Sequence, residues 1–179
     1  VPSWHDAPNA DAINIEMDPG MAFGTGSHPT THLCLQWLDA HFLPGQRLLD
    51  YGAGSGILAI TAARLGAKEV YGIDIDVHAV DSARKNALKN QVSGVFLTAK
   101  EADSLTKNHF DVLIANILTN PLKMLASLLP AYLKTGGMLI LSGILAEQAQ
   151  DVIDAYRPYM MLEVDGQCDG WVRLAGQKT

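Results

Sequence analysis

A glycine-rich turn follows a short apolar stretch in the segment LLDYGAGSGIL, residues 48–58. Gly52, Gly54 and Gly56 would let the backbone turn sharply and let a ligand lie directly against it. The dinucleotide-binding fingerprint G-x-G-x-x-G would need its third glycine at position 57, which is Ile57 in this chain. The turn therefore has the form G-x-G-x-G, which need not accommodate a pyrophosphate. A tight strand-to-helix turn without any ligand is the alternative interpretation.

Two carboxylates lie near this turn. Asp50 precedes the glycines, where it would repel phosphate and attract an ammonium group. Asp74 ends the next apolar stretch, about 20 residues beyond the glycines, where an acidic side chain accepts hydrogen bonds from both ribose hydroxyls. Asp76 is better placed to cap the helix that follows. We therefore expect a ribose to bind at Asp74.

Asn116 ends a further predicted strand, in the segment IANILTNPL, residues 114–122. An amide at this place can accept an N–H from an amine or bind the polar end of a cofactor, although it could also satisfy loop backbone. The implied ligand has a ribose, an amino-acid end near Asp50 and no phosphate. S-adenosylmethionine fits this description, so the residues predict a methyltransferase with Asn116 as the candidate catalytic residue.

Several other active sites are excluded because residues they need are missing. A Walker phosphate loop needs a lysine, which the segment GTGSHPTT at 24–31 lacks. The nucleophile elbow G-x-S-x-G is found around neither Ser27 nor Ser55. His28 and His32 have a metal-compatible spacing, but no carboxylate completes a zinc site. We expect no metal, and no paired carboxylates suggest glycoside chemistry.

The apolar periodicity predicts strands that alternate with helices. Expected strands cover residues 12–18, 47–52, 69–74, 94–99, 110–116 and 136–143, with a closing hairpin from 161–166 and 170–176. Expected helices begin at a cap on Thr30 or Thr31 and end before Pro44, and cover 57–66, 78–91, 121–133 and 144–156. This alternation is typical of an α/β fold, a parallel sheet with helices on both faces that binds ligands at the carboxyl ends of its strands.

The composition is that of one ordinary domain. The chain has 179 residues, of which 48% are hydrophobic, and no apolar run approaches the length of a membrane helix. The net charge of −6 argues against direct nucleic-acid binding. Cys34 and Cys168 form neither a disulfide framework nor a zinc cluster, which favours a reducing, cytoplasmic location.

Five segments, in this order and spacing, resemble a known family. They are DPGMAFGTGSHPTT, LDYGAGSGILAI, GIDID, ANIL with NPL, and LSGIL. Together they resemble the methyltransferases of large-subunit ribosomal protein L-eleven (PrmA), and the resemblance covers essentially the whole chain. The glycine turn and Asp74 are common to many methyltransferases, whereas AFGTGSHPTT combined with ANIL is specific to this family.

The resemblance implies a fold, a cofactor and a set of contacts. The fold is the Rossmann-like fold of S-adenosylmethionine-dependent methyltransferases, a seven-stranded, mostly parallel sheet with helices on both faces and an antiparallel last strand. The glycine segment before Thr31 would fold over the cofactor as a lid. The implied cofactor-binding residues are Thr31, Gly52, Gly54, Asp74 and Asn116, with Phe23, Gly24 and Thr25 as neighbours.

The resemblance also implies an activity and a partner. The reaction is methylation of lysine ε-amines and the N-terminal α-amine of the ribosomal protein, with Asn116 orienting the amine. We expect residues 1–179 to be the catalytic domain alone, without the family's N-terminal substrate-recognition domain, and to be a monomer.

Two alternatives remain open: a lysine methyltransferase of the same fold that acts on another protein, and a nucleoside-binding module without catalysis.

Overall fold

The computed structural model describes residues 9, 12–17 and 26–179 of the chain. The predicted cofactor neighbours Phe23, Gly24 and Thr25 lie outside the described residues, and so does most of the predicted lid. In the part of the chain that is described, no helix is long and apolar enough to cross a membrane.

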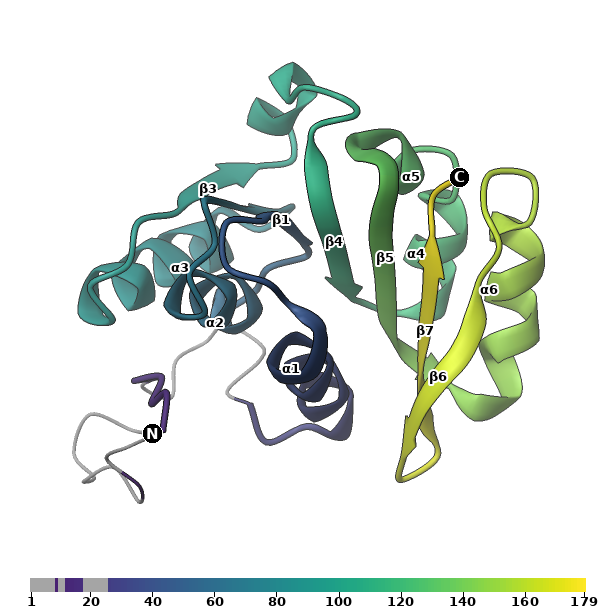
Figure 1. Ribbon diagram of the computed structural model, residues 1–179, viewed down its shortest axis with the longest axis horizontal. Helices are drawn as coiled ribbons and strands as arrows, with labels where there is room; N and C mark the ends of the chain where they lie inside the picture. The colour runs from purple at the N-terminus through teal and green to yellow at the C-terminus, as the bar shows by residue number, and fades with distance from the viewer. Residues whose placement is uncertain (1–8, 10–11, 18–25) are drawn as a thin grey trace.

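One seven-stranded sheet forms the centre of the molecule, in the order β3-β2-β1-β4-β5-β7-β6 (Figure 1). The strands β1 to β5 pair in parallel, and β7 runs antiparallel to both of its neighbours, β5 and β6. This confirms the predicted mostly parallel sheet with an antiparallel last strand. The strands are β1 Arg47–Tyr51, β2 Glu69–Asp74, β3 Val95–Thr98, β4 Phe110–Asn116, β5 Leu133–Leu145, β6 Glu163–Cys168 and β7 Trp171–Gln177.

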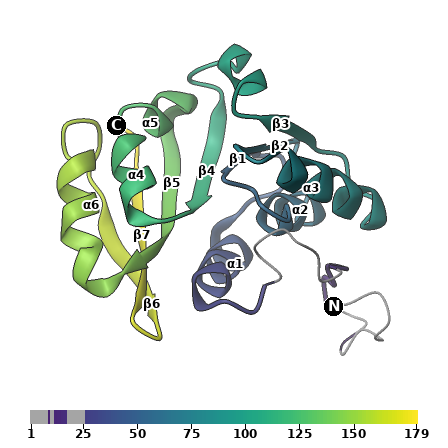
Figure 2. The ribbon, with the colours of Figure 1, turned by 180° about the vertical axis from the view of Figure 1, so that it is seen from behind.

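Helices cover both faces of the sheet (Figures 1 and 2). The helices α1 Pro29–His41, α2 Ile57–Arg64 and α3 Val77–Lys89 pack on one face. The helices α4 Thr119–Met124, α5 Leu129–Tyr132 and α6 Ala149–Tyr156 pack on the other. Side chains alternate along each strand, so Leu48 and Ile140 join the first core while Leu49 and Leu139 join the second.

The strand order reverses between β1 and β4, because the chain moves from β1 outward to β3 and then returns to β4. In an open α/β sheet, ligands bind in the crevice outside the carboxyl ends of the strands at this switch point. Gly52 follows β1, Asp74 ends β2 and Asn116 ends β4. The topology therefore brings three predicted site residues to one edge of the sheet.

The first helix begins differently from the prediction. Its N-cap is His28, whose Nδ1 accepts from the Thr30 N–H, rather than Thr30 or Thr31. Pro29 occupies the first helical position, where its fixed φ suits a helix start and its missing N–H costs nothing. Both threonines consequently lie inside the first turn, where their side chains are buried.

The strand expected at residues 12–18 is wrong, because the described residues 12–17 belong to no strand. The side chain of Asn90, at the end of α3, takes the place of a neighbouring strand. It accepts from the Glu16 N–H at 2.7 Å and donates to the Glu16 carbonyl at 2.8 Å. Met17 is buried against the first core. The alternation of apolar residues in this segment is therefore explained by burial and not by pairing in a strand.

Two of the expected helices differ from the prediction in their bounds. The helix predicted at 121–133 is divided into α4 and α5, with Pro130 in the first turn of α5. The last helix begins at Ala149, because residues up to Leu145 continue β5 and a short 3-10 turn, Ala146–Gln148, follows them. The predicted hairpin is confirmed as β6 and β7, joined at Asp169-Gly170, which both have positive φ.

Candidate functional site

The glycine turn after β1 is held close to the end of β4. Gly52 has a φ of 81°, and its N–H donates to the Ile73 carbonyl at 2.7 Å. A Cβ at Gly52 would lie 2.3 Å from Cγ2 of Ile117, the residue after Asn116. Because both the φ and the space exclude a side chain, only glycine lets the turn approach this strand end.

Asp74 lies beside the glycine turn, as predicted. Its Oδ2 accepts from the Gly54 N–H at 2.8 Å, and its Oδ1 accepts from the Asp76 N–H at 3.0 Å. The residue is half-buried. Each carboxylate oxygen keeps a further lone pair, so the group can accept hydrogen bonds from a vicinal diol. Asp76 caps α3 through the His78 N–H at 2.9 Å, which confirms its predicted role.

Two apolar side chains beside Asp74 were missed by the sequence reasoning. Ile75 is 86% exposed and Val77 is 56% exposed. Ile75 directly follows Asp74, the last residue of β2, and Val77 is the first residue of α3, so both offer apolar surface near the carboxyl edge of the sheet, suited to the base of a nucleoside. The only hint in the sequence was an apolar residue between two aspartates in GIDID.

Asp50 uses one of its two carboxyl oxygens within the protein, and its attraction for an ammonium group stays a prediction. The side chain is buried under the turn, and its Oδ2 accepts from the Ala59 N–H in the first turn of α2 at 3.2 Å. Gly56, the N-cap of α2, has no side chain to satisfy that amide. Asp50 therefore serves as the cap of α2.

Burial raises the pKa of Asp50 from 3.8 to about 7, and the nearby charge of Asp74 adds to the rise. The hydrogen bond from Ala59 opposes this shift. The Oδ1 atom has no hydrogen-bond partner among the described residues.

Thr31 and Asn116 lie far apart in the sequence, and the fold brings them together. The Asn116 Nδ2 donates to the Thr31 Oγ1 at 3.2 Å across 85 positions of sequence. Thr31 is 2% exposed and Asn116 is half-buried. This contact joins the first turn of α1 to the end of β4, so two predicted site residues form one polar pair.

The loop after Asn116 is held on both sides. A Cβ at Gly143, which has a φ of 85°, would lie 2.3 Å from the Ile117 carbonyl oxygen. Ile117 therefore lies between Gly143 on β5 and Gly52 after β1. This arrangement fixes where the side chain of Asn116 leaves the sheet.

A pocket of about 370 Å³ lies next to this loop. The Thr119 hydroxyl donates to the Gln148 Oε1 at 2.6 Å beside it. None of its lining residues is charged. They are Leu118, Thr119, Asn120, Pro121, Gly143, Leu145, Gln148 and Trp171.

A second pocket, of about 380 Å³, lies at the opposite, amino edge of the sheet. Two of its cations are already paired: Arg47 lies 3.0 Å from Glu69, and Lys134 lies 2.8 Å from Asp111. It contains none of the predicted site residues. We therefore take the carboxyl edge as the candidate site.

The groups at the carboxyl edge are suited to bind a neutral or cationic ligand. A carboxylate, an amide, a hydroxyl and exposed apolar groups meet there, and none of the residues described above at this edge is a lysine or arginine. Within the described ranges, no group of three or more metal-ligating side chains could hold a metal ion. The arrangement suits a phosphate-free nucleoside with a polar tail.

Comparisons with known sequences agree with this geometry. The family model described as ribosomal protein L11 methyltransferase (PrmA) matches residues 1–179. A relative named ribosomal protein L11 methyltransferase, from Thiobacillus denitrificans, is 56% identical over 178 residues, or 99% of this chain. The match covers 59% of that relative, so the chain spans about three fifths of its length.

Solved structures give the same result. The crystal structure of a ribosomal protein L11 methylase from Lactobacillus delbrueckii superposes with a TM-score of 0.89 and 34% identity, and covers 100% of this chain and 93% of that one. A 16S rRNA methyltransferase from Thermus thermophilus, solved with AdoMet and guanosine, has a TM-score of 0.73. At 23% identity, over 88% of this chain and 45% of that one, it shows the shared fold alone.

The burial of Asp50 predicts a pH dependence of stability. The unfolded chain releases this proton near pH 4, whereas the folded protein holds it to about pH 7. The folded state therefore binds more protons between these values, and Asp50 lowers the free energy of unfolding as the pH rises through them.

The Asp50→Asn variant cannot ionise, so it should gain stability relative to wild type from pH 4 to pH 7, by on the order of a few kcal/mol. Urea unfolding of both proteins at several pH values measures the difference. A difference that stays constant across this range would contradict the raised pKa.

Proposed function

Because the chain belongs to the ribosomal protein L11 methyltransferase family, we propose that it binds S-adenosylmethionine at the carboxyl edge of β1, β2 and β4. The methyl group would go to amino groups of a large-subunit ribosomal protein. The observation that carries this proposal is the Thr31–Asn116 pair, which shares the switch-point edge with Asp74 and the glycine turn.

Each described site residue has a part in this proposal. The Asp74 carboxylate would accept hydrogen bonds from the two ribose hydroxyls. The backbone at Gly52 and Gly54 would lie against the nucleoside. Ile75 offers an apolar surface to the base. Thr31 and Asn116 would bind the methionine end. Phe23, Gly24 and Thr25 remain predicted neighbours of the cofactor.

The chain's contribution to the reaction is mainly positioning. When bound, S-adenosylmethionine supplies an electrophilic methyl group on a sulfonium, and the acceptor must present a neutral amine in line with it. A lysine amine with a pKa near 10.4 costs about 4.6 kcal/mol to deprotonate at pH 7, and burial in an uncharged pocket lowers that cost.

Asn116 is suited to orient that amine. Its Nδ2 donates to Thr31, which leaves the Oδ1 to accept an N–H from the acceptor. This is a role in orientation and not in proton removal.

The pocket beside Asn116 is the proposed entry for the acceptor. Leu118, Pro121, Leu145 and Trp171 give it apolar walls that fit the aliphatic stem of a lysine. Its lack of charged lining residues keeps a neutral amine favourable there.

Recognition of the ribosomal protein would depend mostly on parts of the longer relatives that this chain does not span. We propose that residues 1–179 form the catalytic domain and act as a monomer in the cytoplasm. The net charge of −6 supports a protein acceptor over direct binding to nucleic acid. Lysines of another protein, or nucleoside binding without catalysis, are the competing functions.

Transfer of a labelled methyl group from S-adenosylmethionine tests the proposal. The chain should label ribosomal protein L11, more slowly than a full-length relative does but with similar cofactor affinity. Labelling of a different protein alone would favour the first competing function. Cofactor binding with no labelling of any protein would favour the second.

Replacement of Asp74 tests the ribose contact. Charge-assisted hydrogen bonds contribute about 1.5–3 kcal/mol, so Asp74→Ala should weaken cofactor binding roughly tenfold to a hundredfold. Calorimetry measures both proteins, with Asp81→Ala, on the exposed side of α3, as the matched control. Unchanged affinity in Asp74→Ala would remove this residue from the site.

Asn116 and Thr31 should respond differently to substitution. Asn116→Ala removes both the Nδ2 donor and the Oδ1 acceptor of the amide and should lower kcat more than it lowers cofactor affinity. Thr31→Val breaks the same hydrogen bond but retains the Asn116 Oδ1, so it should mainly weaken cofactor binding. Steady-state kinetics at saturating cofactor separate the two. Equal effects of both variants on kcat would show that Asn116 acts only in cofactor binding.

A further inference from the structure

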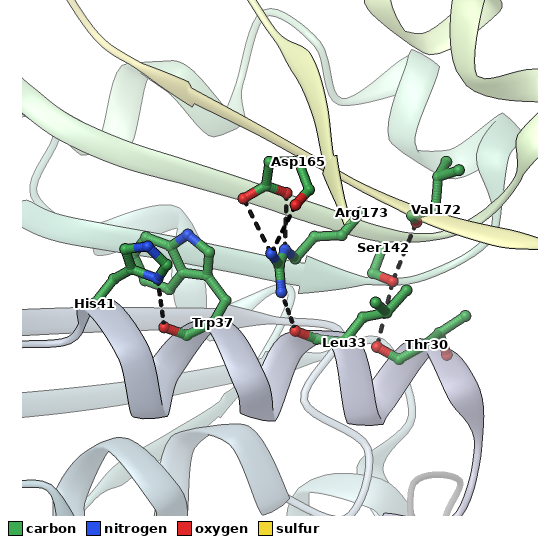
Figure 3. A network of polar contacts seen from close by, with 8 residues as sticks. All are labelled: Thr30, Leu33, Trp37, His41, Ser142, Asp165, Val172 and Arg173. Carbon is green, nitrogen blue, oxygen red and sulfur yellow. Dashed lines mark hydrogen bonds and ion pairs between the residues drawn. The ribbon is translucent and has the colours of Figure 1, made fainter. Parts of the chain in front are cut away.

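A row of polar side chains crosses the sheet beneath α1. Asn116 on β4, Ser142 on β5 and Arg173 on β7 all point to the α1 face, since their strand neighbours Ala115, Leu141, Val172 and Leu174 pack in the opposite core. Asn116 and Ser142 are direct partners in the β4–β5 register. Figure 3 shows the side chains of Ser142 and Arg173 between the strands and α1, directed toward the helix.

Arg173 is the charged member of this row and is 7% exposed. Its Nε and Nη2 donate to the two carboxylate oxygens of Asp165 on β6, at 2.8 and 3.1 Å. Its Nη1 donates to the Leu33 carbonyl inside α1 (Figure 3). Every nitrogen of the guanidinium is thus bound within the protein, so this side chain is not available to a ligand.

Local sequence makes room for the arginine. The β6–β7 register shifts between Val164 and Gly166, and this irregularity places Asp165 beside Arg173. Gly166 is the direct partner of Arg173, and a Cβ there would lie 3.1 Å from the Arg173 Cζ and 3.3 Å from the Leu33 Cδ2. The absence of a side chain at Gly166 lets the guanidinium reach α1.

The polar row contacts α1 at three successive places. The Ser142 hydroxyl lies 3.3 Å from the Thr30 carbonyl, Asn116 donates to the Thr31 hydroxyl, and Arg173 donates to the Leu33 carbonyl. The buried face of α1 is otherwise apolar, apart from these threonines. Apolar contacts are non-directional, so the polar contacts define the rotation and axial position of the helix.

We infer that Arg173 is a positioning residue for the cofactor site: by binding Leu33 it holds α1 where Thr31 meets Asn116. The inference rests on the proposed function, in which Thr31 and Asn116 bind the cofactor. A buried ion pair is by itself weak evidence for stability, and its best-attested use is to fix register. Here Arg173 joins β6, β7 and α1 in one geometry.

The test measures binding of S-adenosylhomocysteine, the unreactive product, by calorimetry at a temperature where each variant is folded by circular dichroism. Arg173→Met should weaken binding about tenfold, as coupling between sites commonly does. The lysine of Arg173→Lys can contact Leu33 or Asp165 but not both. The affinity of this variant for S-adenosylhomocysteine should therefore lie between those of wild type and Arg173→Met.

The control is Arg47→Met. It also breaks a cross-strand pair of arginine and carboxylate, with Glu69, but at the amino edge of the sheet. Its affinity for the product should match that of wild type. An equal loss of affinity in this variant would reduce the Arg173 effect to general destabilisation and overturn the inference.

A double variant separates positioning from stability. Arg173→Met leaves the Asp165 carboxylate unpaired, whereas Arg173→Met/Asp165→Asn removes both charges and so avoids the cost of an unpaired carboxylate. The loss of affinity should persist in it, because the Leu33 carbonyl still lacks its donor. Wild-type affinity in a folded double variant would overturn the inference.

A mutant cycle identifies the route of the effect. In a Thr31→Val background, where the contact with Asn116 is already broken, Arg173→Met should cost clearly less than in wild type. Equal losses in both backgrounds would show that Arg173 does not act through Thr31. Unchanged product binding in Arg173→Met overturns the inference but leaves the proposed function intact, whereas a wild-type protein that binds no product overturns both.

Discussion

The hydrogen bond from the Asn116 amide to the Thr31 hydroxyl joins two predicted site residues at the carboxyl edge of the sheet, where α1 packs on β4. Asn116 ends a central strand, and Thr31 lies in the first turn of the helix that covers it. The bond is long for its type, at 3.2 Å. Its geometry depends on the surrounding backbone and is not secured by its own strength, so the elements on either side must each be held in place.

The sheet side is held by close backbone packing. Ile117 lies between Gly52 and Gly143, two positions where neither the conformation nor the space admits a side chain. The helix side is held by Ser142 and Arg173. The proposed site thus combines a fixed nucleoside end, built by Asp74 and the glycine turn, with a methionine end whose position depends on how α1 docks.

Much of this arrangement followed from the sequence. Alternating strands and helices required a parallel sheet, and the carboxyl ends of parallel strands share one edge, so Gly52, Asp74 and Asn116 had to meet. The direction of the Asp50 side chain did not follow, because it depends on an uncapped helix amide. The pairing of Arg173 with Asp165 depends on a shifted strand register that no local pattern indicates. The roles of Phe23, Gly24 and Thr25 stay predictions.

The most direct test of the central claim is amide chemical-shift mapping by NMR during titration with S-adenosylhomocysteine. We predict saturable shifts at Gly52, Gly54, Ile75 and Ile117, the residues of the carboxyl edge, with no change around the pocket of the amino edge lined by Gln46, Lys68 and Asp111. Shifts confined to that opposite pocket, or no shifts at saturating ligand, would contradict the account.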